Sequence, residues 1–268
     1  MSKTQRFFDL KRQGRPIAVL TAYDAPTARA EAEAGVDAII VGDSVGANML
    51  GYKSEREVTL ADMRHHIAAV RRGAAETAII GDLPFATYDS PEIAVANAQK
   101  LVEAGADVVK FEGAHRAILE AMVAANVAVC CHLGLEPQNH LEKRVKGRSA
   151  QEAAKLLADA IELDAAGMKL LVLEMIPEEV ASEVTRRVLA PTIGIGAGRK
   201  TDGQVLVITD VLGFGAKNFR HNRRYQDVGQ LMVETARAYV RDVHGADFPA
   251  EENLTHMAPE ELALFLGA

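Results

Sequence analysis

The chain has 268 residues, of which 49% are hydrophobic, 25% charged and 5% aromatic, with no tryptophan. This composition is typical of a soluble globular protein and excludes a disordered chain or a collagen-like repeat. The formal charge is −7 and the isoelectric point is about 5.7, so the basic footprint of a nucleic-acid-binding protein is missing. These values favour a small-molecule partner.

The sequence predicts a cytoplasmic protein. The N-terminal stretch MSKTQRFFDLKRQGRP has no continuous apolar segment ahead of a cleavage site, so we expect no signal peptide. Nowhere do about 18 consecutive apolar residues occur, so we expect no contact with a membrane. The two cysteines, Cys130 and Cys131, are neighbours in an apolar run, and we interpret them as reduced packing residues.

Short apolar runs, each followed by an Ala-rich helical stretch, recur along the chain. These runs are continuously apolar rather than alternating, which is typical of parallel strands covered on both faces. We count eight runs, which end at Asp24, Ser44, Pro84, Gly113, Gly134, Ile176, Gly198 and Val211. Amphipathic helices are expected between them at residues 26–34, 60–72, 91–104, 115–125, 150–166 and 177–189.

Eight strand-helix units in about 230 residues predict an α/β fold, a single (β/α)8 TIM barrel spanning residues 1–268. A doubly wound sheet is the alternative fold. Additional helices are expected from about 228 to 243 and from about 258, within a C-terminal helical extension that starts at about 215. This extension is a candidate for contacts between subunits.

Acidic residues lie at the predicted strand ends, where a barrel of this kind has its active site. Asp43, Asp82 and Glu112 end the second, third and fourth runs. Three carboxylates converging on one space repel one another, and a hard divalent cation with oxygen ligands removes this repulsion. We therefore predict a Mg2+ site at these three residues; the alternative is that each aspartate caps the helix that follows it.

Three further polar residues belong to the same predicted rim. Lys110 lies two positions before Glu112, hence on the same face of the strand, and places a cation beside the acidic residues; the alternative is a buried Lys-Glu pair. His132 ends the fifth run and is either a functional residue or a satisfied core histidine. Glu174 ends the apolar run LLVL and is a candidate general base, with a buried ion pair as the alternative.

Several phrases of the sequence occur together in one known family. They are TAYDAPTA, VGDSVGANMLGY, GDLPFATY, AGADVVKFEG, CHLGLEPQ, LLVLEMIP and GIGAGRKTDGQVLVITDVLG, in this order between Leu20 and Gly213. With them the chain resembles the 3-methyl-2-oxobutanoate (ketopantoate) hydroxymethyltransferase family of pantothenate biosynthesis.

The resemblance implies a fold, a reaction and a set of site residues. Its members are (β/α)8 barrels that often assemble as decamers, so a homo-oligomer is expected. They transfer a one-carbon unit from the co-substrate 5,10-methylenetetrahydrofolate to a 2-oxoacid, through an enolate stabilised by Mg2+. By motif, the metal positions are Asp43, Asp82 and Glu112, the substrate-binding positions are Asp43, Ser44, Asp82, Lys110 and His132, and the catalytic proton acceptor is Glu174.

The sequence departs from the family pattern in two loops, residues 139–149 and 214–226. The first lacks a Gly-Gly-Tyr-Lys-type stretch and the second a Pro-Lys-Phe phrase. These departures leave open a divergent hydroxymethyltransferase that uses another 2-oxoacid. A Mg-dependent lyase or aldolase of the phosphoenolpyruvate mutase and isocitrate lyase type also fits an acidic barrel rim, although the cysteine motif of those enzymes is not evident in this chain. A barrel without catalytic activity is the third reading.

Overall fold

The computed structural model describes residues 3–139, 144–215 and 219–267. Its strands form one closed, fully parallel barrel in which each strand pairs with its neighbour in sequence and the eighth pairs with the first. The strands are β1 (Ile17–Thr21), β2 (Ala38–Val41), β3 (Ala78–Asp82), β4 (Val108–Glu112), β5 (Val129–Gly134), β6 (Leu170–Glu174), β7 (Thr192–Ile195) and β8 (Gly203–Leu206). The predicted TIM-barrel fold is confirmed, and the doubly wound alternative is wrong.

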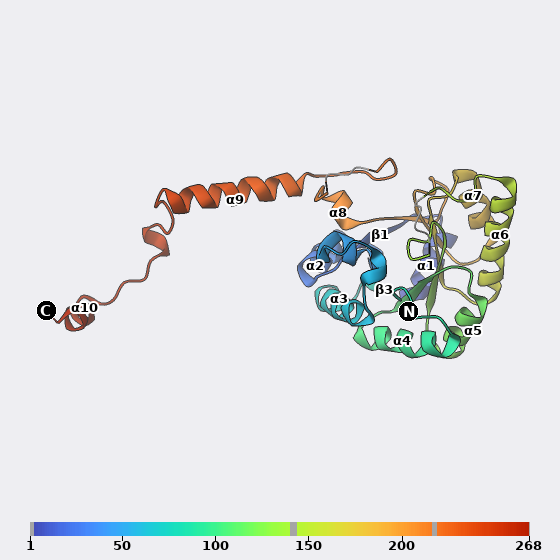
Figure 1. Ribbon diagram of the computed structural model, residues 1–268, viewed down its shortest axis with the longest axis horizontal. Helices are drawn as coiled ribbons and strands as arrows, with labels where there is room; N and C mark the ends of the chain where they lie inside the picture. The colour runs from blue at the N-terminus through green and yellow to red at the C-terminus, as the bar shows by residue number, and fades with distance from the viewer. Residues whose placement is uncertain (1–2, 140–143, 216–218, 268) are drawn as a thin grey trace.

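Helices alternate with the strands and surround them (Figure 1). The surrounding helices are α2 (Ala25–Ala34), α3 (Leu60–Gly73), α4 (Pro91–Ala104), α5 (Arg116–Ala124), α6 (Ala150–Ala165) and α7 (Glu178–Arg187). Neighbouring helices from α2 to α7 contact one another in sequence order. These six elements agree with the six helices expected from the amphipathic segments.

The apolar strand residues divide into two cores because successive side chains point to opposite faces of a strand. One core lies between the strands and the surrounding helices and includes Ile39, Ile79 and Leu171. The other contains the side chains that alternate with them, such as Ile40 and Ile80. This double burial explains why the strands read as continuous apolar runs. The predicted packing role of the two cysteines is confirmed, since Cys130 and Cys131 are free and buried.

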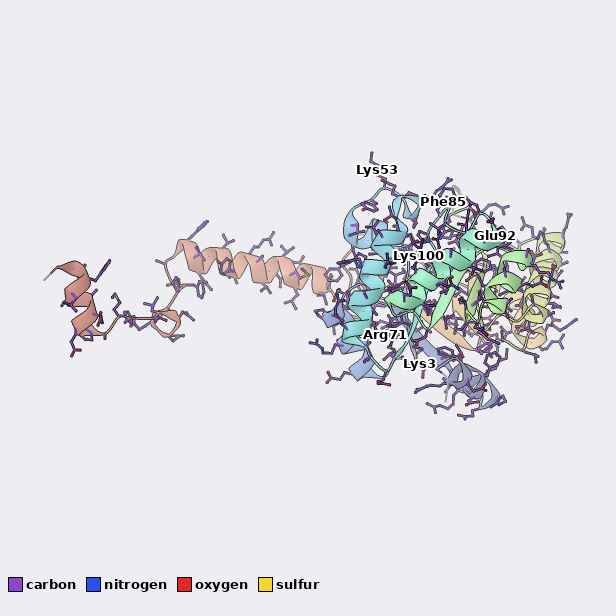
Figure 2. All side chains as sticks on the ribbon, turned by 90° about the horizontal axis from the view of Figure 1, so that it is seen from below. Lys3, Lys53, Arg71, Phe85, Glu92 and Lys100 are labelled. Atoms are coloured by element: carbon purple, nitrogen blue, oxygen red, sulfur yellow. The ribbon has the colours of Figure 1, made fainter. Side chains whose placement is uncertain are left out.

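A helix that the sequence analysis did not predict, α1 (Lys3–Arg12), precedes the first strand. Phe7 is 0% exposed and Leu10 is 4% exposed, and both belong to the second core together with the first residues of several strands. Lys3 and Arg71 both bond to Asp107, which precedes β4, and Figure 2 shows the two basic residues near each other. The helix α1 therefore packs at the end of the barrel where the strands begin.

Polar side chains and a glycine cap the ends of α2 and α4. The Asp24 side chain accepts a hydrogen bond from the backbone N–H of Thr27, which caps α2, and Ser90 caps α4 in the same way ahead of Pro91. Gly35 ends α2 with φ of 83°, a left-handed conformation that glycine adopts without strain.

The structure differs from the predicted elements in two segments, one after β8 and one after β2. The eighth strand ends at Leu206 rather than at Val211, because residues Ile208–Val211 form a short helix, α8, instead. A π-helix, η1 (Gly46–Leu50), and a 3-10 helix, η2 (Glu55–Glu57), follow β2. The apolar run after Gly203 does not show where the strand ends, because a buried helical turn and a buried strand have similar composition over a few residues.

The C-terminal segment extends away from the barrel as an arm (Figures 1 and 2). It consists of α9 (Val228–His244), a 3-10 helix, η3 (Glu251–Asn253), and α10 (Pro259–Leu266). None of the described residues of these three elements is buried. The two helices expected from about 228 and from about 258 are present as α9 and α10. No helix in the described part of the chain has the length and apolar character needed to cross a membrane.

Candidate active site

The predicted rim residues lie at the carboxyl ends of neighbouring strands. Pairing between strands places Asp82 opposite Lys110 and Glu112 opposite His132, while Glu174 pairs with Gly134. The barrel therefore brings the candidate residues of β3, β4, β5 and β6 to one end.

Lys110 and Asp82 form a buried ion pair in this site. The Lys110 Nζ atom lies 2.6 Å from Asp82 Oδ2, and the two residues are 6% and 2% exposed. Burial alone would lower the pKa of Lys110, but the negative charges of Asp82, Asp43 and Glu112 outweigh it and raise the pKa above its usual value. Lys110 therefore stays protonated and is a fixed positive charge. Its hydrogen-bond partner is Asp82 rather than Glu112, the partner in the sequence-based alternative.

Asp43, which follows β2, lies beside this pair. Its Oδ2 atom accepts a 2.6 Å hydrogen bond from Gln138 Nε2, so its side chain does not cap the helical segment that follows it. Burial, followed by the charge of Asp82, raises the pKa of Asp43 to about 7. Asp82 Oδ1 is buried and has no hydrogen-bond partner among the described residues. When both aspartates are ionised, the single positive charge of Lys110 neutralises only one of them.

Magnesium fits this pair of aspartates. Among the residues that the structure describes, no three His, Cys, Asp or Glu side chains are grouped so that they hold an ion by themselves. Mg2+ is usually bound by one or two carboxylates, with water and substrate in the remaining positions. The free Asp82 Oδ1 and the raised pKa of Asp43 agree with such a two-carboxylate site. Direct binding by Glu112 stays a prediction.

Glu112, His132 and Glu174 form a second group in the site. His132 Nδ1 lies 3.7 Å from Glu112 Oε1, and His132 Nε2 lies 3.3 Å from Glu174 Oε2. Burial raises the pKa of Glu112 to about 9, which favours its protonated form at neutral pH. His132 is buried, and neither ring nitrogen has a hydrogen-bond partner in the described residues. The histidine therefore lies between two carboxyl groups with both nitrogens available.

The backbone around Glu174 holds this residue at the strand end. Its carbonyl oxygen accepts a hydrogen bond of 2.8 Å from the N–H of Leu135. A Cβ atom on Gly134 would lie 2.2 Å from the same carbonyl oxygen, so only glycine permits this approach of the two strands. Met175, the next residue, has φ of 48°, an uncommon value outside glycine that is often found at functional sites. The Glu174 side chain keeps 20% exposure and can meet a substrate.

Ser44 is held by a residue from the first strand end. The Tyr23 hydroxyl and Ser44 Oγ are 2.8 Å apart, and burial raises the pKa of Tyr23 to about 12. The phenol thus remains protonated, and it restricts the rotation of the serine hydroxyl. The neighbouring residues His65 and His66 are outside this group, since His65 is exposed and His66 bonds through Nδ1 to the Tyr23 carbonyl at 2.7 Å.

Two residues of the site were missed by the sequence analysis. Gln138 is 1% exposed and bonds to Asp43, and Tyr88 is 7% exposed and bonds to Gln138. Neither ends a strand: Gln138 lies in a turn after β5, and Tyr88 lies in the segment between β3 and α4. The available signals were the quoted phrases CHLGLEPQ, which ends in Gln138, and GDLPFATY, which ends in Tyr88.

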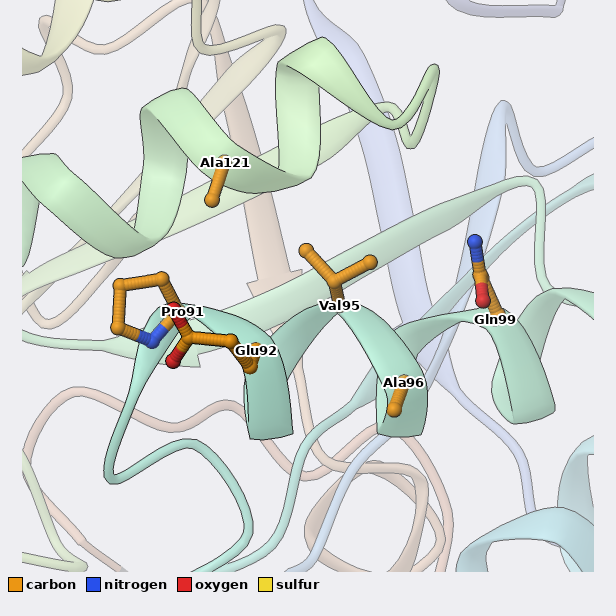
Figure 3. A pocket seen from close by; sticks show the side chains of 6 residues that line it. All are labelled: Pro91, Glu92, Val95, Ala96, Gln99 and Ala121. Carbon is orange, nitrogen blue, oxygen red and sulfur yellow. The ribbon is translucent and has the colours of Figure 1, made fainter.

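A shallow groove on the outside of the barrel is separate from this site. It has a volume of about 400 Å³ and lies between α4 and α5 (Figure 3). Its lining residues are Pro91, Glu92, Val95, Ala96, Gln99 and Ala121. None of them is a strand-end residue, so the groove contributes nothing to the chemistry of the rim.

A closed (β/α)8 barrel with acidic groups and a buried lysine at its strand ends defines a barrel enzyme. The sequence profile of the family described as ketopantoate hydroxymethyltransferase matches residues 2–251. The chain belongs to this family, and the resemblance noted in the sequence is confirmed. It is an enzyme of the transferase class.

Relatives with the same description span nearly the whole chain. A 3-methyl-2-oxobutanoate hydroxymethyltransferase of Chloroflexus aurantiacus is 44% identical over 265 residues, covering 97% of this chain and 94% of the relative. One from Roseiflexus sp. (strain RS-1) is 46% identical over 261 residues and covers 94% of each chain. One from Geobacillus sp. (strain WCH70) is 43% identical over 270 residues and covers 97% of each.

Solved structures with a similar fold are more distant in sequence. A phosphonopyruvate hydrolase complex with oxalate and Mg++ has a TM-score of 0.64 at 12% identity, covering 100% of this chain and 95% of the other. A 2,3-dimethylmalate lyase of the PEP mutase/isocitrate lyase superfamily has a TM-score of 0.61 at 14% identity, covering 98% and 94%. At such low identity these structures establish the fold alone, and the lyase alternative fits the comparisons less well than the transferase.

Proposed function

We propose that the protein transfers a hydroxymethyl group from 5,10-methylenetetrahydrofolate to 3-methyl-2-oxobutanoate, forming 2-dehydropantoate for pantothenate and coenzyme A biosynthesis. The observation that carries this proposal is the buried Lys110–Asp82 pair with Asp43 beside it and Glu174 at the same end of the barrel. A 2-oxoacid needs a site that binds its carboxylate and keto oxygens and removes a proton from C3. This rim contains groups suited to both tasks.

Lys110 and Ser44 bind the oxoacid in this proposal. The protonated Lys110 faces the negative charge of the substrate and of the enolate that forms from it. Ser44, whose hydroxyl is held by Tyr23, donates a hydrogen bond to the substrate oxygens. His132, whose ring nitrogens have no hydrogen-bond partner among the described residues, lies near the same end and completes the polar lining.

Asp43 and Asp82 would hold Mg2+, with Glu112 as the third predicted acidic position. When bound, the metal supplies Lewis-acid stabilisation of the charge that develops on the substrate oxygens. The Asp82 Oδ1 atom, which has no hydrogen-bond partner in the described residues, supports this assignment.

Glu174 is the proposed proton acceptor. Its carboxylate takes the C3 proton, and the resulting enolate carbon forms the new bond to the methylene carbon of the folate. Both carbon–nitrogen bonds that hold the methylene carbon to the folate are broken in the transfer. Water supplies the hydroxyl group of the product, and the two folate nitrogens take up the C3 proton and the second proton of water. His132 Nε2 lies 3.3 Å from Glu174 Oε2 and is the nearby polar group on the neighbouring strand.

The divergent loops bear on the choice of substrates. Residues 139 and 144–149 of the first loop and residues 214–215 and 219–226 of the second are described, whereas residues 140–143 and 216–218 lie outside the described part. A different oxoacid therefore remains the second candidate. We also propose a cytoplasmic location, which agrees with two free, buried cysteines.

We further propose that the chain assembles with copies of itself, as a decamer in the manner the family resemblance implies. We treat residues 1–268 as one barrel domain whose helical extension starts at about 215. The arm supports assembly because Tyr239 and Phe265 are 59% and 74% exposed, and large apolar side chains gather at protein interfaces.

The activity is tested by proton NMR of 3-methyl-2-oxobutanoate in deuterated water with enzyme and Mg2+. We expect loss of the C3 proton signal without folate, and a new hydroxymethyl product when the methylene donor is added. A lyase would cleave its substrate without consuming folate. Neither exchange nor product would contradict the proposed substrate and indicate another oxoacid.

The role of Glu174 is tested in the same assay with Glu174→Gln. The amide keeps the size of the side chain and cannot accept the proton, so C3 exchange is expected to fall by about 100-fold or more. Oxoacid binding, measured by calorimetry, should change little. Undiminished exchange would place the base elsewhere.

A further inference from the structure

Gln138 links the loops that follow four strands of the barrel. Its backbone N–H donates to Glu112 Oε2 at 2.9 Å. Its side-chain Nε2 donates to Asp43 Oδ2 at 2.6 Å and to the Leu83 carbonyl at 3.0 Å. Its Oε1 accepts from the Tyr88 hydroxyl at 2.5 Å. One residue after β5 thus bonds to groups at or after the ends of β2, β3 and β4.

Three hydrogen bonds fix the orientation of the Gln138 amide, and the Tyr88 hydroxyl makes one of them. Burial and the charge of Glu112 raise the pKa of Tyr88, so the phenol keeps its proton and is a donor. Only the Gln138 oxygen can accept this bond, which leaves the amide nitrogen to face Asp43 and Leu83. A flipped amide would place its oxygen against the Asp43 carboxylate and the Leu83 carbonyl and would lose both of those bonds.

The Tyr88 side chain is itself held in place. Its ring lies 5.8 Å from the ring of Phe111 between centroids, and Phe111 is fully buried. The preceding residue, Thr87, accepts a hydrogen bond from Asn97 on α4 at its carbonyl, and its hydroxyl donates to the Pro84 carbonyl. The orientation of the amide is therefore set by the packed loop between β3 and α4.

Asp43 and Glu112 are two of the acids assigned to Mg2+, and both are bonded by Gln138. A buried carboxylate without such a donor can rotate, and its preferred position is then set by repulsion from neighbouring acids. Residues that hold metal ligands through hydrogen bonds commonly change metal affinity by about 10–100-fold when they are replaced.

We propose that Gln138 is a positioning residue that fixes the Asp43 and Glu112 carboxylates for metal binding, with Tyr88 helping to hold its amide in place. This inference rests on the proposed function, since it concerns the metal site assigned there. It predicts that the side-chain amide matters for binding the ion itself, before any reaction occurs.

The test is direct binding of Mn2+, used as a probe for Mg2+, measured by electron paramagnetic resonance on the full chain without substrate. Gln138→Met keeps the length of the side chain and the backbone bond to Glu112 but removes all three hydrogen bonds of the side-chain amide. We expect it to raise the Mn2+ Kd about 10-fold or more. Tyr88→Phe leaves the amide in place without its orienting bond, and we expect a smaller rise of about threefold.

Thr192→Val is the matched control. Thr192 is fully buried, and its hydroxyl bonds to Thr185, but it begins β7 and therefore lies at the opposite end of the barrel. It loses a buried hydrogen bond as the Gln138 variant does, so it should lower the melting temperature without changing the Mn2+ Kd. An equal loss of Mn2+ affinity in this control would show a general effect of stability and overturn the proposal.

The remaining outcomes distinguish the proposed metal site from the proposed role of Gln138. Wild-type protein that binds no Mn2+ would overturn the metal site and the role of Gln138 together. Wild-type binding with an unchanged Kd in folded Gln138→Met would overturn only the role of Gln138. If that variant does not fold, Tyr88→Phe decides: a raised Kd supports the proposal, and an unchanged Kd overturns it.

Discussion

Asp82 is the residue whose environment is most difficult to explain without a bound cation. One of its oxygens bonds to Lys110, and the other is buried without a partner in the described residues. Asp82→Asn keeps the shape and removes the charge, so we expect Mg2+-dependent turnover to be lost while far-UV circular dichroism shows a folded barrel. Asp202→Asn, which alters an aspartate paired with Lys11 instead, is the control and should keep turnover. Full activity in Asp82→Asn would contradict the metal assignment.

Glu31 is a buried acid outside the rim, with both carboxylate oxygens unpartnered among the described residues. Burial, followed by the charge of Asp24, raises its pKa from 4.5 to about 8. The folded state therefore keeps a proton on Glu31 at pH values where the unfolded state has released it. The stability that this proton contributes is complete below the pKa of the unfolded state, and it is lost as pH rises through the pKa of the folded state.

Glu31→Gln removes this titration. Because one pKa unit corresponds to about 1.4 kcal/mol, wild-type protein should lose on the order of several kcal/mol of unfolding free energy between about pH 5 and about pH 9 from this group. Urea unfolding at both pH values should show a smaller loss in the variant. Glu33→Gln, at an exposed position of the same helix, should behave as wild type. An equal loss of unfolding free energy between the two pH values in wild type and in Glu31→Gln would refute the raised pKa of Glu31.

At the residue scale, the strand-end groups could be predicted because a parallel strand in a barrel has a known functional end. Lys110 and Glu174 each follow apolar runs, so their sequence neighbours locate them. Gln138 could not be located in this way. Its partners are 26 and 95 residues away in sequence, and the turn that positions it leaves no periodic pattern.

At the scale of elements, α1 shows how tertiary packing decides what local sequence leaves open. Its 10 residues contain two buried apolar side chains, Phe7 and Leu10, which are too few to produce a clear helical period. The helix forms where it packs against the first residues of the strands. The amphipathic helices α3 and α4 could be predicted because each has 14 residues and an N-cap signal.

Phe7→Ala tests the contribution of α1. Phe7 is 0% exposed in the core that includes the ends of several strands, so truncation leaves a cavity and should lower the unfolding free energy by about 3–5 kcal/mol. Phe8→Ala, at the adjacent half-buried position, should cost clearly less. Urea denaturation measures both. Equal losses of unfolding free energy in the two variants would mean that burial of Phe7 does not stabilise the barrel.

At the scale of the whole molecule, the barrel and the arm differ in how they are stabilised. The helix that follows β8, α8, has four residues, whereas α3 and α4 have 14 each. The next long helix, α9, has 17 residues and lies away from the barrel (Figure 1). Its apolar positions 232, 236, 239, 240 and 243 follow the helical period and form one stripe. An amphipathic helix of this kind is stabilised mainly by packing its apolar face.

Val240→Glu tests whether this stripe meets another copy of the chain. Val240 is 47% exposed in the single chain, so a charge there should cost little stability if the arm stays in solvent. Buried in an interface, the same charge is unpaired and strongly unfavourable. We therefore expect sedimentation to show smaller assemblies for Val240→Glu than for wild type. Glu234→Gln, at an exposed position of the same helix, should leave the assembly unchanged. A wild-type chain that sediments as a monomer would contradict the proposed assembly, and unchanged assemblies in Val240→Glu would place the interface elsewhere.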